Sequence, residues 1–341
     1  MREPEQEESD IDESINGEFE IERGPKRFTL NELAAATYNF AKEGKLGQGG
    51  FGEVYRGLLN EEEVATKKVS AGSQQGKKEY ISEVRIISRL RHRNLVQLVG
   101  WCHKQGEFLL VYKFMPNGSL DTHLYRPDRF LAWPVRYKIA LGLASALLYL
   151  HEEWEQCVVH RDIKPSNVML DSEFEAKLGD FGLARLVDHE TGSQTTVLAG
   201  TMGYLAPESL STGRARKESN VYSFGIVALE IACGRKPEEF GKAKLVEWAW
   251  EPYGRKMILK AADERLSMEF DEKEMERLMV VGLWCAHPDH TLRPSIRQAT
   301  SVLKLEAPLP TLPPTMPVPT FVVPPMGMLN TASSISVRWV C

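Results

Sequence analysis

The fold is decided by the stretch His160-Arg161-Asp162-Ile163-Lys164-Pro165-Ser166-Asn167, which lies near the middle of this chain of 341 residues. Two shorter motifs follow it in order, Asp180-Phe181-Gly182 and Ala206-Pro207-Glu208. Asp162 could accept the proton of an incoming hydroxyl, and the side-chain oxygens of Asn167 and Asp180 are hard ligands of the kind that magnesium prefers. Any one motif could occur by chance, but their joint order and spacing form a recognised signature set. The sequence therefore predicts a site that combines a carboxylate base with a divalent metal ion.

A glycine-rich stretch, Gly47-Gln48-Gly49-Gly50-Phe51-Gly52, lies upstream of these motifs. Glycines allow the backbone to approach phosphate groups because no Cβ atom intervenes. The pattern alone is a weak signal, since a tight turn between two strands has the same composition. Residues 45–69 alternate like strands and no helix opens at the third glycine, which argues against a dinucleotide site of the Rossmann type. A phosphate-covering loop and a plain turn both stay open at this point.

A lysine follows in the apolar run Val64-Ala65-Thr66-Lys67. A lysine on such a strand would ordinarily face solvent. The presence of Glu83 in the next expected helix changes that expectation, because a lysine oriented by a carboxylate can hold the α- and β-phosphates of a nucleotide. Strand alternation points the adjacent Lys68 to the other face.

Composition and charge exclude several classes of protein. The net charge is −5, and residues 1–23 alone carry ten acids and two bases, so the remainder has a charge of about +3. A nearly balanced body without a basic stripe argues against a nucleic-acid binder. The five cysteines form no C-x-x-C pair, which favours a reducing compartment and gives no readable zinc site. We find no signal peptide and no uninterrupted apolar run of membrane-spanning length.

The expected elements place strands early in the chain and helices later. Thr29 and Glu32 form a capping-box pattern that predicts a short lead-in helix. We expect strands over 45–69 and 108–112, and helices over 75–90, 134–151, 221–233, 273–287 and 294–305. Residues 1–27 are expected to be an acidic disordered leader, and residues 306–341 a proline-rich disordered tail. P-x-x-P spacing occurs twice in this tail, which leaves a ligand for a proline-reading module open beside the simpler interpretation of a plain extended tail.

Residues 44–305 resemble a eukaryotic protein kinase of the plant receptor-like kinase branch. Besides the motifs above, the stretches Phe28–Leu33 and His92–Cys102 are similar to that branch. The nearest resemblance is to the kinase portion of legume-type (L-type) lectin-domain receptor kinases. It implies an α+β, two-lobed protein-kinase-like fold, with a lead-in helix over 28–43, a small β-rich lobe with one main helix over 44–115 and a larger, mainly helical lobe over 119–305.

The resemblance also implies roles for individual residues. Asp162 would orient and deprotonate the substrate hydroxyl, Lys164 would neutralise the transferring phosphoryl group, and Asn167 and Asp180 would bind magnesium. Tyr112 falls at the position known in the family as the gatekeeper. The implied nucleotide-binding residues are Leu46, Gly47, Gly49, Gly52, Val54, Ala65, Lys67 with its partner Glu83, Lys113, Met115, Met169 and Asp180. Glu208 would pair with Arg293 beneath the substrate-binding segment.

Substrate class follows from the same resemblance. Serine/threonine kinases carry a lysine two residues after the catalytic aspartate, as Lys164 does here, and Gly200-Thr201 supports this assignment. Arg161 would read a phosphate on the activation segment, residues 180–208. The candidate phosphorylation sites are Thr195, Thr196, Thr201 and Ser193.

One position departs from the family pattern. Asn220 stands where the family has an aspartate that opens the large buried helix and accepts hydrogen bonds from the catalytic loop. Asparagine keeps one acceptor oxygen but loses the charge, and we expect its NH2 group to face donors that it cannot satisfy. Losing a charge-assisted bond of about 1.5–3 kcal/mol would slow catalysis about ten- to a hundred-fold if all of it reached the transition state.

These observations lead to two hypotheses. The first is an ATP- and Mg²⁺-dependent serine/threonine kinase, with Mn²⁺ as an alternative ion, which phosphorylates protein substrates and a second copy of itself in receptor-like kinase signalling. The second is a kinase-fold scaffold or weakly active pseudokinase, because of Asn220. We expect a cytoplasmic location, at the inner face of the plasma membrane if the chain is part of or associated with a receptor. A receptor fragment and a soluble relative both stay open.

Overall fold

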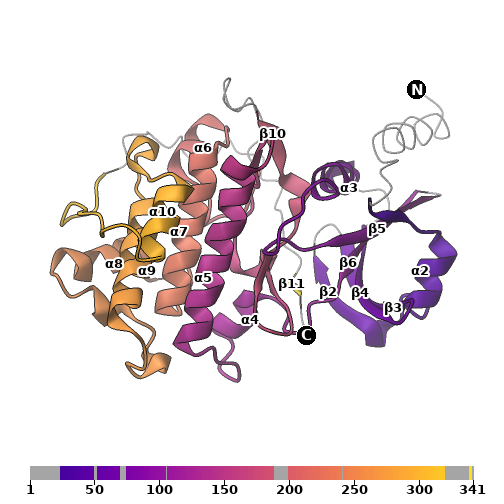
Figure 1. Cartoon of the computed structure of the whole chain (residues 1–341), viewed down its shortest axis with the longest axis horizontal. Coiled ribbons are helices and arrows are strands. Elements are labelled where there is room, and N and C mark those ends of the chain that lie inside the picture. Colours follow the sequence, from indigo (N-terminus) through magenta and orange to yellow (C-terminus); the bar gives the residue numbers. More distant parts are fainter. Residues whose placement is uncertain are drawn as a thin grey trace.

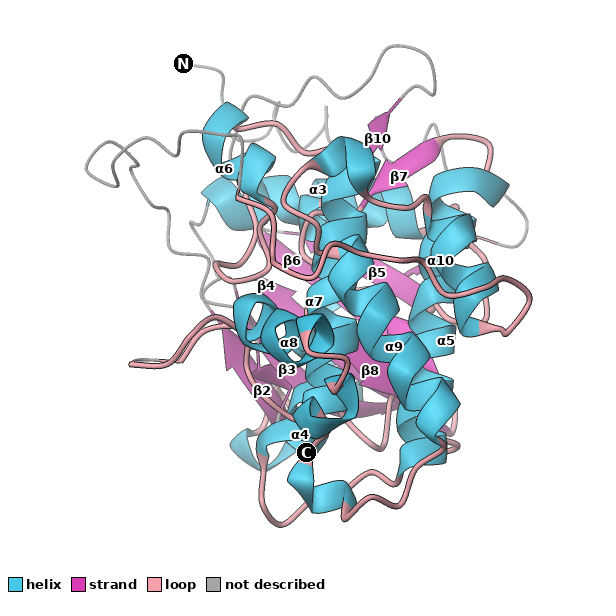
Figure 2. Ribbon diagram, turned by 90° about the vertical axis from the view of Figure 1, so that its left-hand side faces the viewer, coloured by secondary structure: helices cyan, strands magenta, loops and turns pink. Residues whose placement is uncertain are grey.

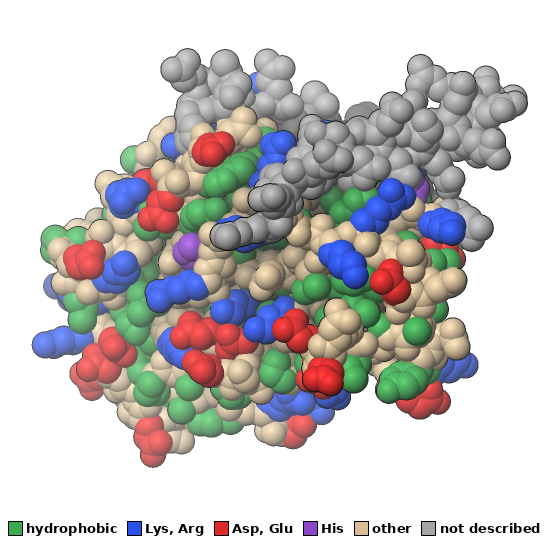
Figure 3. All heavy atoms as spheres, turned by 45° about the vertical axis from the view of Figure 1, so that its right-hand side comes forward, with side chains coloured by type: hydrophobic (Ala, Val, Ile, Leu, Met, Phe, Trp, Pro, Cys, Tyr) green, Lys and Arg blue, Asp and Glu red, His purple; other side chains and the backbone are tan. Residues whose placement is uncertain are grey.

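The computed structural model describes residues 24–49, 52–69, 74–104, 106–187, 199–239, 241–318 and 338–339. They form two lobes, a small lobe built on a twisted sheet and a larger lobe built of helices (Figure 1). This arrangement confirms the expected two-lobed fold. On the face drawn in Figure 3, basic and acidic side chains are interspersed, as the nearly balanced charge of the body predicts. Among the described residues, no helix is long and apolar enough to cross a membrane.

The small lobe is organised by a seven-stranded sheet with the order β1-β5-β6-β4-β3-β2-β11. The strands are β1 (Lys26–Arg27), β2 (Lys45–Gly49), β3 (Gly52–Leu59), β4 (Glu62–Val69), β5 (Leu98–Lys104), β6 (Glu107–Lys113) and β11 (Arg338–Trp339). The pairs β2–β3, β3–β4 and β5–β6 are antiparallel, as suits strands joined by short turns. The pair β4–β6 is also antiparallel, although α3 and β5 lie between its strands in the chain.

Helices cover the two faces of this sheet, and strand alternation assigns each side chain to one of them. On β6, Leu109 and Val111 pack with Leu33 of α2 (Leu30–Ala36). Leu110 and Tyr112 belong instead to the core that includes α3 (Gln74–Ile87). The same alternation on β4 explains why neighbouring side chains of this strand have different surroundings.

The lead-in helix α2 begins where the sequence predicts it. The Thr29 hydroxyl accepts from the Glu32 N–H at 3.2 Å, and the Glu32 carboxylate accepts from the Thr29 N–H at 2.7 Å. This capping box satisfies two backbone donors that a helix start leaves open. Phe28, just before the cap, is buried and fixes the helix against the sheet.

The large lobe is built around α7 (Lys217–Cys233), which is buried along most of its length. The other helices are α4 (Leu120–Tyr125), α5 (Trp133–Leu148), α6 (Pro207–Thr212), α8 (Leu245–Gly254), α9 (Glu272–Cys285) and α10 (Ile296–Leu303). Figure 2 views this lobe end-on, with α8 and α9 in front of α7. Gly234 ends α7 with φ 63°, a left-handed conformation that glycine adopts without strain. The helix begins earlier than the expected 221–233, so Asn220 lies within its first turn and is not its N-cap.

Short strands position the loops that face the small lobe. They are β7 (Cys157–Val159), β8 (Val168–Leu170), β9 (Ala176–Leu178) and β10 (Arg185–Val187), paired as β7–β10 and β8–β9. The stretch His160–Asn167 lies between β7 and β8, and the Asp180 motif follows β9. The paired strands β8 and β9 separate these two motifs in the sequence, and both motifs face the space between the lobes.

The proline-rich tail departs from the sequence-based expectation. We expected disorder from residue 306 onward, but residues 306–318 lie against the large lobe, and Leu312 is only 8% exposed. The composition excludes a helix or central strand, as expected. It does not exclude docking as an extended segment, because backbone carbonyls and apolar side chains remain available.

Candidate active site

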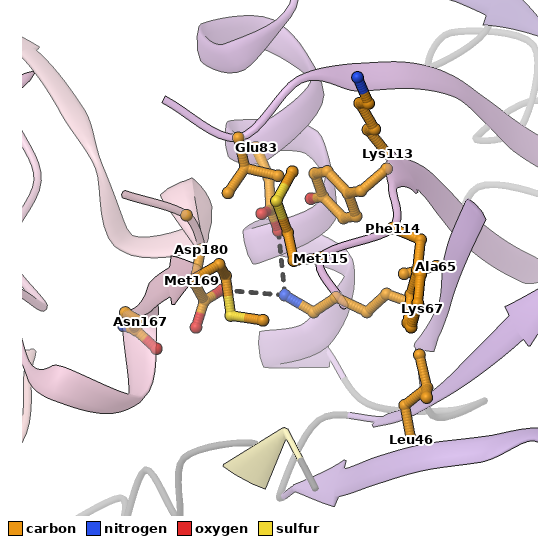
Figure 4. A pocket seen from close by; sticks show the side chains of 13 residues that line it. Leu46, Ala65, Lys67, Glu83, Lys113, Phe114, Met115, Asn167, Met169 and Asp180 are labelled. Atoms are coloured by element: carbon orange, nitrogen blue, oxygen red, sulfur yellow. Dashed lines mark hydrogen bonds and ion pairs between the residues drawn. The ribbon is translucent and has the colours of Figure 1, made fainter. Parts of the chain in front are cut away.

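A cleft between the lobes contains about 610 Å³ of space that protein atoms do not fill, including space that is open to solvent. Both lobes contribute to its wall (Figure 4). The lining residues are Leu46, Ala65, Lys67, Glu83, Val96, Tyr112, Lys113, Phe114, Met115, Asn167, Met169, Gly179 and Asp180. Most of the residues implied for nucleotide binding therefore meet in one place.

Lys67 is held in this cleft by two carboxylates. Its Nζ lies 3.0 Å from Glu83 Oε2 on α3 and 2.9 Å from Asp180 Oδ1 in the large lobe (Figure 4). Burial alone would lower the pKa of Lys67, but Asp180 and Glu83 outweigh it and raise that pKa above its ordinary value. Lys67 is therefore a fixed, buried cation that links the two lobes.

The neighbouring Lys68 lies on the other face of β4, as alternation predicts. Its Nζ forms an ion pair with Glu107 at 3.1 Å and lies over the Phe40 ring. Its side chain is about one-third exposed. Two adjacent lysines thus have opposite surroundings, and only Lys67 reaches the cleft.

Not every implied residue lines the cavity. Val54 is fully buried and packs behind Ala65, where it supports the wall. Gly47, Gly49 and Gly52 belong to the β2–β3 hairpin at the cleft and are not among its lining residues. A Cβ atom on Gly52 would lie 2.1 Å from the Lys68 carbonyl oxygen, so close strand packing requires this glycine.

Sequence reasoning missed three lining residues, Val96, Phe114 and Gly179. Phe114 lies between Lys113 and Met115, both of which are implied nucleotide-binding residues, so its place in the sequence could have indicated it. Val96 is brought to the wall by its backbone, whose N–H donates to the Leu178 carbonyl at 3.0 Å. Only the tertiary pairing of these loops reveals that contact.

The polar groups of the stretch His160–Asn167 gather around Asp162. Lys164 Nζ lies 2.6 Å from Asp162 Oδ2, and the Thr201 hydroxyl donates to Asp162 Oδ1 at 2.7 Å. Asn167 Nδ2 donates to the backbone oxygen and to Oδ2 of Asp162, at 2.8 and 3.0 Å. These contacts fix the Asp162 carboxylate in one orientation. These bonds orient the Asn167 side chain, whose oxygen Oδ1 is of the kind that could bind a metal ion.

Asp180 is positioned by its own backbone and by the residue that follows. Its φ of 62° is left-handed, a strained conformation that is common at functional sites. Phe181 is buried against His160, with ring centroids 4.7 Å apart, and its N–H donates to Glu83 Oε1 at 3.2 Å. Burial would raise the pKa of Asp180, but Lys67 and Lys164 overcome this and lower it. Asp180 is therefore an anion at neutral pH.

The expected ion pair between Arg293 and Glu208 is present and buried. Arg293 and Glu208 form two parallel contacts, Nη1–Oε1 and Nη2–Oε2, each of 2.8 Å. Both side chains are almost fully buried. The pair connects α6 to the segment between α9 and α10.

Both polar atoms of the Asn220 side chain have hydrogen-bond partners, which the sequence did not suggest. Its Oδ1 accepts from the Arg161 N–H at 3.1 Å, and its Nδ2 lies 3.0 Å from His151 Nε2. Burial, assisted by the positive charge of Lys217, lowers the pKa of His151 to about 3, so its ring is neutral and Nε2 can accept. The expectation of an unsatisfied NH2 group was wrong, because His151 is brought to it from a distant part of the chain.

This geometry predicts a modest effect for Asn220→Asp. The change strengthens the bond to Arg161, while His151 can accommodate a carboxylate by donating from Nε2. We expect the phosphoryl-transfer rate to rise by no more than about five-fold, because a charge-assisted hydrogen bond is only about 1 kcal/mol stronger than a neutral one. Asn220→Leu, which removes both bonds, should lower the free energy of unfolding by about 1–3 kcal/mol. Rate assays and urea unfolding test both. An inactive chain that Asn220→Asp activates would contradict this account.

Arg161 connects Asn220 to the activation segment. Its backbone φ is 75°, and its Nη1 lies 3.5 Å from the Leu183 carbonyl oxygen. Burial, followed by repulsion from Arg185, lowers the pKa of Arg161 to about 10. The guanidinium groups of Arg161 and Arg185 are both positively charged and repel one another, so together they favour the binding of an anion such as a phosphate group. Of the candidate phosphorylation sites, Thr201 is described, whereas Ser193, Thr195 and Thr196 lie outside the described residues.

Comparisons with known proteins agree with this geometry. The protein kinase domain family matches residues 40–303. The L-type lectin-domain containing receptor kinases IX.1 and IX.2 of Arabidopsis thaliana are 63% and 57% identical over 90% and 89% of this chain, and 49% and 47% of their own lengths. The L-type lectin-domain containing receptor kinase SIT2 of Oryza sativa subsp. japonica is 51% identical over 88% of this chain and 46% of its own length. The chain spans about half the length of these relatives. It belongs to the protein kinase family, and its resemblance to the kinase portion of L-type lectin-domain receptor kinases is confirmed.

Proposed function

We propose that this chain transfers the γ-phosphate of ATP to serine and threonine hydroxyls of protein substrates. The observation that carries the proposal is the triangle of Asp162, Lys164 and Thr201. The Thr201 hydroxyl contacts Asp162 at 2.7 Å and Lys164 Nζ at 2.8 Å, so a small aliphatic hydroxyl already fits between the base and the cation. An incoming substrate hydroxyl would use the same carboxylate as its proton acceptor.

The remaining roles follow from charge and position. Asn167 and Asp180 would hold Mg²⁺, or Mn²⁺ in its place, because both offer oxygen ligands on the large-lobe side of the cleft (Figure 4). The metal would neutralise charge on the transferring phosphates. Lys67 would contact the α- and β-phosphates, and Lys113 and Met115 would meet adenine through their backbones. Asp162 would take the substrate proton.

We assign the chain to receptor-like kinase signalling on the cytoplasmic side of a membrane, because its relatives are named as receptor kinases. Autophosphorylation of the activation segment is part of this proposal. A phosphate there would add nearly two negative charges close to Arg161 and Arg185. The scaffold alternative is not favoured, since both polar atoms of the Asn220 side chain have partners.

Incubation with radiolabelled ATP and Mg²⁺, followed by acid hydrolysis and phosphoamino-acid separation, tests the proposal. We expect labelled phosphoserine and phosphothreonine, and mass spectrometry should place part of the label at Ser193, Thr195, Thr196 or Thr201. Phosphotyrosine as the sole product would contradict the substrate class. Absence of label from both the chain and an added protein substrate, despite demonstrated ATP binding, would favour the scaffold.

A further inference from the structure

Residues 307–318 of the proline-rich tail, called the tail below, are bound far from the nucleotide cleft. It contacts α8, which lies at the end of the large lobe opposite the small lobe (Figures 1 and 2). We call this surface the α8 groove; it is formed by Trp250, Tyr253 and Gly254 of α8, which contact the tail directly. Met257 and Ile258, which follow α8, line a cavity beside the groove together with Leu312 and Pro314 of the tail. None of these residues takes part in the proposed phosphoryl transfer.

Two aromatic side chains of α8 form hydrogen bonds with the backbone of the tail. Trp250 Nε1 donates to the Pro313 carbonyl oxygen at 2.9 Å. The Tyr253 hydroxyl accepts from the Leu312 N–H at 2.8 Å and lies 3.3 Å from the Leu312 carbonyl oxygen. Aromatic residues that combine an apolar ring with a polar tip are the usual means of recognising proline-rich segments.

Apolar packing and backbone shape make the fit selective. Leu312 is part of the core of the large lobe, and Leu309 and Met316 are partly buried against the same core. A Cβ atom on Gly254 would lie 1.9 Å from the Pro314 carbonyl oxygen and 3.0 Å from its carbon. Glycine at the end of α8 is therefore required for the close approach of the tail, and any larger residue would collide with its backbone.

The start of the tail is held separately. Arg277 Nη1 donates to the Ala307 carbonyl oxygen at 2.9 Å and to the Val302 carbonyl oxygen at 3.1 Å. This contact directs the chain from α10 toward α8. The prolines fix φ and limit the conformational entropy that docking removes.

We propose that the α8 groove is a recognition site for an extended, proline-rich segment with the spacing Leu-Pro-Thr-Leu-Pro-Pro, and that the chain's own tail is its occupant. The proline-reading surface that the P-x-x-P spacing suggested thus lies in the same chain. Tethering gives the tail a high effective concentration at the groove, so the groove is occupied until the tail is released. Release would expose a surface able to bind another segment of the same chemistry.

Peptide binding to the full chain tests the proposal. A synthetic peptide of residues 307–318 is titrated by calorimetry against the unaltered chain and against a Leu312→Asp chain, whose own tail should leave the groove. We expect the Leu312→Asp chain to bind the peptide at least about ten-fold more tightly than the unaltered chain, because the tethered tail no longer competes. Adding Gly254→Val to the Leu312→Asp chain should abolish binding. Glu247→Val in the same chain is the matched control, since it places the same residue at an exposed position of α8 and should leave binding intact.

Hydrogen exchange provides a readout that does not require a folded variant. In the unaltered chain, the Leu312 amide should exchange at least about ten-fold more slowly than in a free tail peptide. Unprotected exchange there, or a folded Leu312→Asp chain that does not bind the peptide, would overturn the proposal. A dimer that dissociates on adding peptide would overturn the assignment of the chain's own tail as the occupant.

Discussion

Replacing Lys67 by methionine should lower the rate of phosphoryl transfer by at least about a hundred-fold, the loss found when one preorganised charge-stabilising donor is removed. Lys67 is the buried cation between Glu83 and Asp180, at 3.0 and 2.9 Å. Methionine has a similar length but no charge, so it leaves the two carboxylates facing one another and provides nothing for the phosphates. Initial rates of label transfer from ATP to an added protein substrate measure the effect.

Lys68→Met is the matched control, because it makes the same chemical change one residue away on the opposite face of β4. Its ion pair with Glu107 is partly exposed, and such pairs contribute about 0–1 kcal/mol to stability. We expect this variant to keep its activity within about two-fold of the unaltered chain. A Lys67→Met chain that retains more than about a tenth of the activity would contradict the assigned role, since one charge-stabilising donor should account for far more.

Replacing Arg293 by methionine should lower the free energy of unfolding by about 3–5 kcal/mol. The reason is that Glu208 would remain buried without its partner. Burial would raise the pKa of Glu208, but Arg293 counteracts it and lowers that pKa. Without the guanidinium, the Glu208 carboxylate must either remain charged in the core or take up a proton, and both carry a cost. Urea unfolding followed by fluorescence measures this loss.

Two further variants distinguish the contribution of the Arg293–Glu208 ion pair from the effect of changed side-chain packing. Glu208→Leu combined with Arg293→Met should be more stable than Arg293→Met alone, because no uncompensated charge remains. Arg297→Met removes an exposed partner of Glu152, whose contact is 2.6 Å, and should cost no more than about 1 kcal/mol. A loss in Arg293→Met as small as that in Arg297→Met would show that the buried pair does not stabilise the lobe.

Local patterns in the sequence predicted most elements of the fold. Thr29 and Glu32 marked the start of α2, the alternation of residues 62–69 assigned Lys67 and Lys68 to opposite faces, and Gly234 marked the end of α7. These features depend on interactions between residues a few positions apart, so the sequence contains all the information they need. The start of α7 was less well predicted, because no favourable capping residue marks it.

The sequence by itself predicted most of the residues that line the candidate site, because the order and spacing of its motifs are specific even without coordinates. Only the tertiary structure decided how three of these features are satisfied: Asn220 by His151, Lys67 by Asp180 as well as Glu83, and the proline-rich tail by the α8 groove. Each depends on a partner far away in the chain. Whether a buried polar group or an extended segment finds such a partner is settled by packing, which no local pattern encodes.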